Sequence, residues 1–145
     1  MEVRTKVENG NPFIFDIFRG KWVAHTPEEG VRQWFCAYLM EQKGYPKPSI
    51  STETGLKLNG CARRCDTVVY KGGSPAVLIE FKAPDVEIND NVLLQAVSYN
   101  TKLRAPYIII TNSKQLYCIR LDFAAGTHEY LNAVPEFKEL KMVNR

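Results

Sequence analysis

Three ionisable residues in the middle of the chain have types and a spacing that suit phosphodiester cleavage. Asp66 is followed fourteen residues later by Glu80, and Lys82 comes two residues after Glu80. Cleaving a phosphodiester calls for a divalent cation with hard oxygen ligands, because the cation neutralises the phosphate and lowers the pKa of an attacking water. We therefore expect Asp66 and Glu80 to hold the cation, while the ammonium of Lys82 orients or deprotonates the water.

A β-hairpin is expected to bring these residues together. Residues 65–70 and 75–81 are strand-like, and the segment Lys71-Gly72-Gly73-Ser74 between them is a good hairpin signal. The unbroken apolar stretch Ala76–Ile79 indicates that the second strand is buried, with Phe81 pointing into the core. Charged residues at the end of a buried strand are rarely placed there by chance.

The register of this hairpin decides whether the two acids meet. If residues 72–74 form a three-residue loop, Lys71 pairs with Pro75 and Asp66 lies directly opposite Glu80. Directly opposed side chains share one face, with Cβ atoms about 4.5 to 5.5 Å apart. Two carboxylates that close raise one another's pKa unless a cation lies between them. Strand alternation then brings Lys82 to the same face as Glu80.

A helix is predicted from Thr26 to about Lys43. Thr26 can cap it, Pro27 suits its first position, and Glu29 completes a capping box, while Gly44 marks its end. Its predicted apolar face consists of Val31, Trp34, Phe35, Tyr38 and Leu39. At about 100° per residue, Glu28 lies near the edge of this face and Glu29 points away from it.

The remaining elements predict an α/β fold with a mixed central β-sheet flanked by helices, like a restriction-endonuclease core. A second helix is a candidate over Asn89–Arg104, where Val92, Leu93, Ala96, Val97 and Leu103 supply apolar positions. Strands are expected over residues 50–58, 107–111 and 115–121. Residues 12–23 suit one or two short strands or a packed N-terminal arm.

Length and composition favour one domain over residues 1–145, with a core over about 26–121, an arm over 1–25 and a loosely packed tail over 122–145. Nineteen basic against sixteen acidic residues give a net charge of +3, which does not by itself indicate nucleic acid. No transmembrane or secretory segment is evident, so we expect a cytoplasmic location and no membrane partner. The four cysteines, Cys36, Cys61, Cys65 and Cys118, are interpreted as free thiols.

These motifs resemble a known superfamily. Arg64-Cys65-Asp66 followed by Glu80-Phe81-Lys82 is similar to the signature of the PD-(D/E)XK nucleases. More narrowly, the segments 27–33, 44–46 and 95–99, together with the Asp66 hairpin, resemble the N-terminal nuclease-like domain of type I restriction enzyme R subunits. The resemblance spans about residues 26 to 121 and implies magnesium-dependent endonuclease cleavage of DNA.

Residue by residue, the resemblance implies that Asp66, Glu80 and Lys82 are catalytic. It also implies that Asp66, Glu80 and a first-helix glutamate hold one or two Mg²⁺ ions, with Mn²⁺ as a substitute. That glutamate matches Glu28 or Glu29, and Glu28 is favoured because Glu29 is explained by the capping box. Gln95 matches a Q-x-x-x-Y helix motif in which the glutamine organises the metal site.

The same motif places Tyr99 near nucleic acid, and Arg64 is a second candidate contact, although a solvated turn explains Arg64 equally well. Cys65 stands where the proline that gives the superfamily its name would be.

No helicase motor accompanies the motifs, so we expect protein partners that supply motor or specificity functions. The alternatives are a nuclease-fold domain that binds nucleic acid or protein without cutting, and an interaction domain with no nucleic-acid role.

Overall fold

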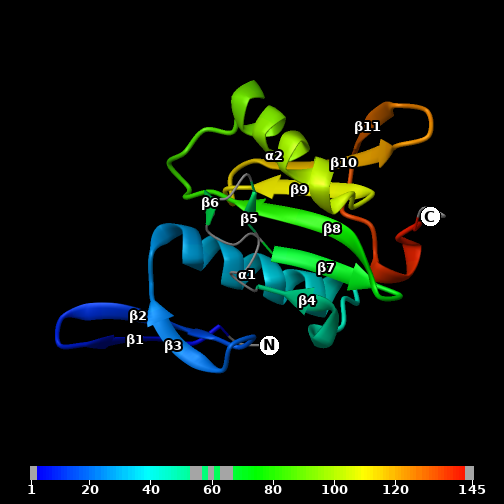
Figure 1. Ribbon diagram of the computed structural model, residues 1–145. Coiled ribbons are helices and arrows are strands. Elements are labelled where there is room, and N and C mark those ends of the chain that lie inside the picture. Colours follow the sequence, from blue (N-terminus) through cyan, green and yellow to red (C-terminus); the bar gives the residue numbers. More distant parts are fainter. Residues whose placement is uncertain (1–2, 53–56, 59–60, 63–66, 143–145) are drawn as a thin grey trace.

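The computed structural model describes residues 3–52, 57–58, 61–62 and 67–142, and of residues 57, 58, 61 and 62 only the backbone. Its centre is a six-stranded sheet of order β11-β10-β9-β8-β7-β4 (Figure 1). The strands are β4 (Ile50–Ser51), β7 (Thr67–Lys71), β8 (Ser74–Phe81), β9 (Tyr107–Thr111), β10 (Leu116–Asp122) and β11 (Thr127–Leu131). β8 and β9 are parallel and the other pairs are antiparallel, which confirms the predicted mixed α/β fold.

Two α-helices of the described chain flank this sheet, α1 (Pro27–Gln42) and α2 (Asp90–Leu103). α1 begins as predicted, because the side chain of Thr26 accepts a hydrogen bond from the Glu29 backbone N–H at 3.1 Å. α2 begins in the same way at Asn89 and ends at Arg104, which adopts a left-handed conformation. Short 3₁₀ helices lie at Lys47–Ser49 and Phe137–Glu139.

The two faces of β8 pack against different helices. Val77, Ile79 and Phe81 belong to one apolar cluster with Val31, Cys36 and Leu39 of α1. Leu78 instead packs in a cluster with Tyr99 of α2. Because side chains alternate along a strand, Glu80 shares the α2 face with Leu78. The parallel pairing of Glu80 with Ile110 agrees, since Ile110 packs with Ala96 of α2.

The turn between β7 and β8 differs from the predicted one, whereas the register beyond it is as predicted. Gly72 and Gly73 both have positive φ and form a two-residue turn, so Lys71 pairs with Ser74 rather than with Pro75. A bulge at Ala76 then restores the predicted register between β7 and β8, so that Thr67 pairs with Ile79.

An antiparallel sheet of three strands precedes α1: β1 (Thr5–Glu8), β2 (Asn11–Asp16) and β3 (Lys21–Ala24). The sequence left open whether this segment formed strands or a packed arm, and the structure shows strands. A further small sheet pairs β5 (Lys57–Leu58) with β6 (Cys61–Ala62).

A buried carboxylate joins the three-stranded sheet to α1. Asp16 is fully buried and accepts hydrogen bonds from the backbone N–H groups of Phe18 and Arg19 at 2.8 and 3.1 Å, and from the Arg19 guanidinium. Arg19 in turn lies 3.7 Å from the carboxylate of Glu29 on α1. Burial alone would raise the pKa of Asp16, but these hydrogen bonds outweigh it and hold the pKa below its ordinary value of 3.8.

Asp16 is therefore expected to make stability depend on pH. Its folded-state pKa is lowered, so its contribution is present above the unfolded value of 3.8 and is lost as pH falls through the folded value. Urea denaturation of the native chain and of Asp16→Asn at a series of pH values tests this. The native chain should be the more stable at neutral pH, and the difference should shrink in acid. A difference that stays constant with pH would contradict it.

Two packing expectations are wrong. Trp34 of α1 is 61% exposed, so it does not lie on a buried face of its helix. The region after Asp122 is not loosely packed throughout, because Val134 and Leu140 are buried in the α1-side core.

Other sequence-based expectations agree with the described residues. Cys36 and Cys118 are free thiols, and burial raises the pKa of each to about 12. Cys61 and Cys65 are outside the side chains that the structure describes. Among the described helices, none combines the length and apolarity that a membrane crossing requires.

Candidate active site

Glu80 and Lys82 lie together where β8 ends. The Lys82 Nζ is 3.7 Å from Glu80 Oε1, and their side chains are 24% and 6% exposed. The backbone N–H of Lys82 donates to the Thr111 carbonyl at 3.0 Å, which continues the β8–β9 pairing past Phe81. Both side chains are thus held on a rigid part of the sheet, on the face that α2 covers.

The second carboxylate oxygen of Glu80 is in an unusual position. Oε2 is buried and has no hydrogen-bond partner among the described residues. A buried, unsatisfied acceptor is costly, and a charged one more so. Such an oxygen is well suited to bind a cation, because the cation would supply the interaction that the protein leaves unmade.

Asp66 and Arg64 are outside the described residues. The nearest described pair is Thr67 with Ile79, whose register is the one that the predicted meeting of Asp66 and Glu80 requires. That meeting stays a prediction. Among the residues described, no three His, Cys, Asp or Glu side chains form a group able to hold a metal ion, and the predicted set depends on Asp66.

Gln95 and Tyr99 lie one turn apart on α2. Tyr99 is 4% exposed and packs with Val68 and Leu78, and its contact with nucleic acid stays a prediction. Gln95 is exposed.

The direction of α2 places Gln95 toward the end of β8. α2 connects the parallel strands β8 and β9 and so runs opposite to them. Moving from Tyr99 back to Gln95 advances about 6 Å along the helix. Moving from Leu78 to Glu80 advances about 6.6 Å along the strand in the same direction. A role for Gln95 at Glu80 is consistent with this arrangement and remains a prediction.

Two of the glutamates of α1, Glu28 and Glu29, lie in its first turn. Glu29 accepts a hydrogen bond from Gln33 Nε2 at 3.1 Å and lies 3.4 Å from Arg32 Nη1. Its carboxylate thus takes part in the network with Arg19, and the choice of Glu28 as a metal ligand stays a prediction. Glu28 is partly exposed in the first turn of α1.

α1 begins on the side of the molecule where β8 and β9 end (Figure 1). Because α1 covers the opposite sheet face from Glu80, Glu28 would have to reach the site around the strand end.

A polar clamp that the sequence did not predict holds the loop after Lys82. Asn112 is buried and donates to the Val86 carbonyl at 2.8 Å, while its oxygen accepts from the backbone N–H of Gln115 at 2.6 Å. The Gln115 side chain accepts from the Ile88 N–H at 3.0 Å. The only sequence signal was the turn-forming Asn112-Ser113 pair, whereas Val86 and Ile88 lie more than twenty residues away along the chain.

Residues 27–135 match the family described as Type I restriction enzyme R protein N terminus (HSDR_N). The chain belongs to this family. The match contains α1, the β7–β8 hairpin, α2 and the rest of the central sheet, and it leaves β1–β3 outside. No curated protein and no solved structure matches the chain significantly.

Membership in the HSDR_N family supports a restriction-endonuclease-like context for Glu80 and Lys82. The chemistry of the described pair agrees with that context, since one buried carboxylate with a free oxygen lies beside a partly exposed amine. Metal binding and hydrolysis are further steps, which we treat as proposals.

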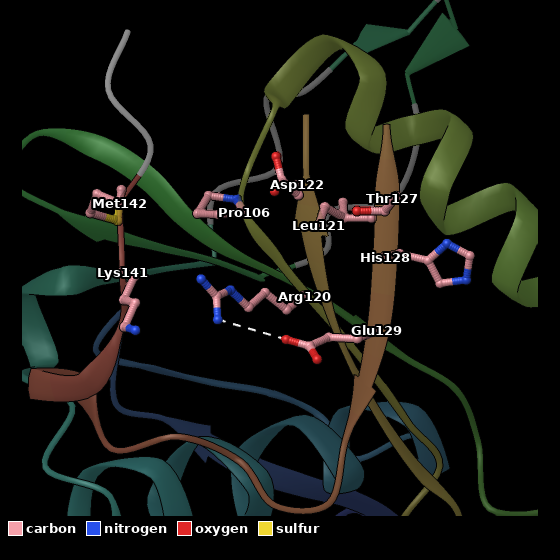
Figure 2. Close-up of a pocket in the computed structure, with 9 residues that line it drawn as sticks. All are labelled: Pro106, Arg120, Leu121, Asp122, Thr127, His128, Glu129, Lys141 and Met142. Carbon is pink, nitrogen blue, oxygen red and sulfur yellow. Dashed lines mark ion pairs between the residues drawn. The ribbon is translucent and has the colours of Figure 1, made fainter. Parts of the chain in front are cut away.

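The HSDR_N-family chain also has a pocket of about 550 Å³ that is remote from Glu80 and Lys82 and lies between the β10–β11 hairpin and residues 141–142. Figure 2 shows Arg120 and Lys141 at this pocket, with Arg120 paired to Glu129 at 3.7 Å. Because Tyr107 pairs with Val77 at the start of β9, this end of the sheet is opposite to the end with Glu80. The pocket therefore belongs to a different part of the molecule.

Proposed function

We propose that this chain is a metal-dependent deoxyribonuclease domain that hydrolyses DNA phosphodiester bonds. The observation that carries the proposal is the buried Glu80 carboxylate, whose Oε2 has no hydrogen-bond partner among the described residues and whose Oε1 lies 3.7 Å from the ammonium of Lys82. Membership in a family of restriction enzyme R proteins supports DNA as the substrate and further subunits as partners.

Glu80 would hold Mg²⁺ together with Asp66, with Glu28 as a third ligand. The ion would neutralise charge on the phosphate and lower the pKa of the attacking water. Lys82 holds its ammonium beside Glu80, where it can orient the water and offset phosphate charge. Gln95 would arrange the polar groups around the site from α2. Burial of Glu80 keeps bulk water away from the charged groups, which strengthens their interactions.

The decisive experiment measures metal binding by the native chain and by Glu80→Gln. Isothermal calorimetry should show Mg²⁺ or Mn²⁺ binding to the native chain and little or none to the variant. Without metal, the variant should be more stable by about 1 kcal/mol, because a neutral amide is cheaper to bury than a carboxylate with an unmatched oxygen. With Mg²⁺, only the native chain should gain thermal stability, because a ligand that binds only the folded state stabilises it.

The matched control is Glu129→Gln, which removes an exposed carboxylate at the far end of the sheet. It should bind metal like the native chain. Absence of Mg²⁺ and Mn²⁺ binding to the native chain would contradict the proposal. DNA binding without cleavage would then favour a nuclease-fold domain that binds but does not cut.

A further inference from the structure

One face of the β1–β3 sheet carries aromatic and cationic side chains in alternation. The pairings Lys6 with Phe13 and Phe15 with Trp22, together with strand alternation, place these four residues on the same face, and Arg4 joins them as the second residue before Lys6. The three rings are all partly exposed. Aromatic rings normally lie in a core, so three of them on an open sheet face call for an explanation.

The cations on this face lie directly over the rings. The Arg4 guanidinium carbon is 4.1 Å from the centroid of Phe15, and Lys6 Nζ is 4.5 Å from the centroid of Trp22. Phe15 and Trp22 also contact each other edge to face, with centroids 5.3 Å apart. The result is an aromatic surface whose two central rings are steeply inclined to each other, at 75°, with a cation over each of them.

The opposite face of the same sheet is the one that packs on the protein. Ile14 and Asp16 are fully buried, and β2 contacts α1. The aromatic face therefore is not needed to attach the sheet to the domain. It also lies outside the family match, which begins at residue 27.

The position of the sheet relates this face to the candidate active site. β3 leads directly into the N-terminus of α1, which lies on the side of the molecule where β8 ends, and the β1–β2 hairpin projects outward from it (Figure 1). A long ligand held on this face could continue to the end of β8.

We propose that the aromatic face formed by Arg4, Lys6, Phe13, Phe15 and Trp22 binds single-stranded DNA beside the cleavage site. This inference rests on the proposed function for the choice of DNA. Bases stack on aromatic side chains and on guanidinium planes, and the neighbouring cations contact phosphates. Single strands are favoured over duplex because only unpaired bases offer their faces to the rings.

Charge supports a polyanion as the occupant. Residues 3–24 contain four basic residues, Arg4, Lys6, Arg19 and Lys21, against the two acids Glu8 and Asp16. Asp16 is buried and pairs with Arg19, so the exposed part of the sheet is positive. The exposed Lys6–Glu8 pair, at 2.8 Å, is the kind of surface ion pair that phosphate can replace at small cost.

The test measures binding of a fluorescein-labelled oligothymidylate by fluorescence anisotropy, in EDTA so that no cleavage occurs. Trp22→Ala should weaken binding about tenfold, the usual effect of losing one stacked base. Arg4→Ala combined with Lys6→Ala should weaken binding and lower the slope of log affinity against log salt by about 1.4, because each phosphate contact to a single strand contributes about 0.7. In a Trp34→Phe background, oligothymidylate should quench the fluorescence of Trp22.

Two control variants separate this result from general effects. Val7→Ala alters an exposed residue on the opposite face of β1, and Lys138→Ala removes an exposed charge far from the sheet, so both should bind like the native chain. Trp22→Phe keeps an aromatic ring and should bind oligothymidylate better than Trp22→Ala. This comparison distinguishes loss of stacking from loss of the fold. Circular dichroism checks the fold of each variant.

The inference is overturned if the native chain does not bind oligothymidylate at low salt, or if the Trp22 and Arg4/Lys6 variants bind it like the native chain. It is also overturned if polyglutamate competes as well as DNA, because the face would then be a general cationic surface. Calorimetric Mg²⁺ binding tests the proposed function separately. Loss of DNA affinity in the sheet variants alongside absent metal binding would leave this inference standing and remove only the nuclease proposal.

Discussion

Replacement of Lys82 by alanine is expected to slow DNA cleavage by about 10² to 10⁴-fold, the range associated with loss of a positioned acid–base group. The ammonium of Lys82 lies 3.7 Å from Glu80, and its side chain is 24% exposed, so it can contact both the carboxylate and solvent. Cleavage of a labelled DNA under saturating Mg²⁺ measures the effect, and calorimetry should show that Lys82→Ala still binds metal.

Lys138→Ala is the matched control, because it removes an exposed lysine outside the candidate site. Its cleavage rate should equal that of the native chain. Equal rates for Lys82→Ala and the native chain, with both folded, would remove Lys82 from the proposed mechanism. A Lys82→Arg variant with most of its activity retained would indicate that charge matters more than proton transfer.

The largest loss of stability is expected from Phe81→Ala, at about 3 to 5 kcal/mol of unfolding free energy. Phe81 is 2% exposed, contacts Phe35 edge to face at 5.9 Å between centroids, and has the Arg32 guanidinium 5.9 Å from its ring. Truncation would leave a cavity between β8 and α1, next to the strand end that holds Glu80. Guanidinium denaturation followed by circular dichroism measures the loss.

Tyr130→Ala provides the comparison, since its ring is 54% exposed on β11. A surface truncation of this kind usually changes stability by about 0.5 kcal/mol or less. Similar losses for the two variants would mean that Phe81 is not a principal core residue. A folded Phe81→Ala chain should also cleave DNA more slowly, because the backbone that positions Glu80 and Lys82 loses its packing.

Local signals made the helices and the central strands predictable from the sequence. The signals for α1 come from residues that are close in the sequence to the ends of the helix: Thr26, Pro27 and Gly44. The structure confirms the helix, which ends within one residue of its predicted end. Tyr107–Thr111 was predicted with its observed bounds because five consecutive apolar or β-branched residues require burial on both faces.

The features that were missed depend on contacts between distant segments. Trp34 has the spacing of a core residue, yet it is 61% exposed on α1. The clamp at Asn112 uses partners on a different loop, and Val134 returns to the core from beyond the last predicted strand. Composition and periodicity carry no information on such long-range pairings.

The candidate site was predictable only in part for the same reason. Alternation correctly placed Glu80 and Lys82 together, since both belong to one strand and its extension. The buried state of Glu80 follows from α2 lying over that face, which the sequence indicates only through the positions of Leu78 and Tyr99.

The bulge at Ala76 also separates the register of the hairpin turn from the register of the rest of the β7–β8 pairing. A one-residue slip between β7 and β8 would exchange the side chains that face α1 for those that face α2. The extra residue on β8 absorbs the difference between a two-residue and a three-residue turn, so Val68 and Val69 keep their partners Leu78 and Val77. The two-residue turn at Gly72-Gly73 therefore leaves the strand pairing nearest Glu80 in the register that a three-residue turn without a bulge would give.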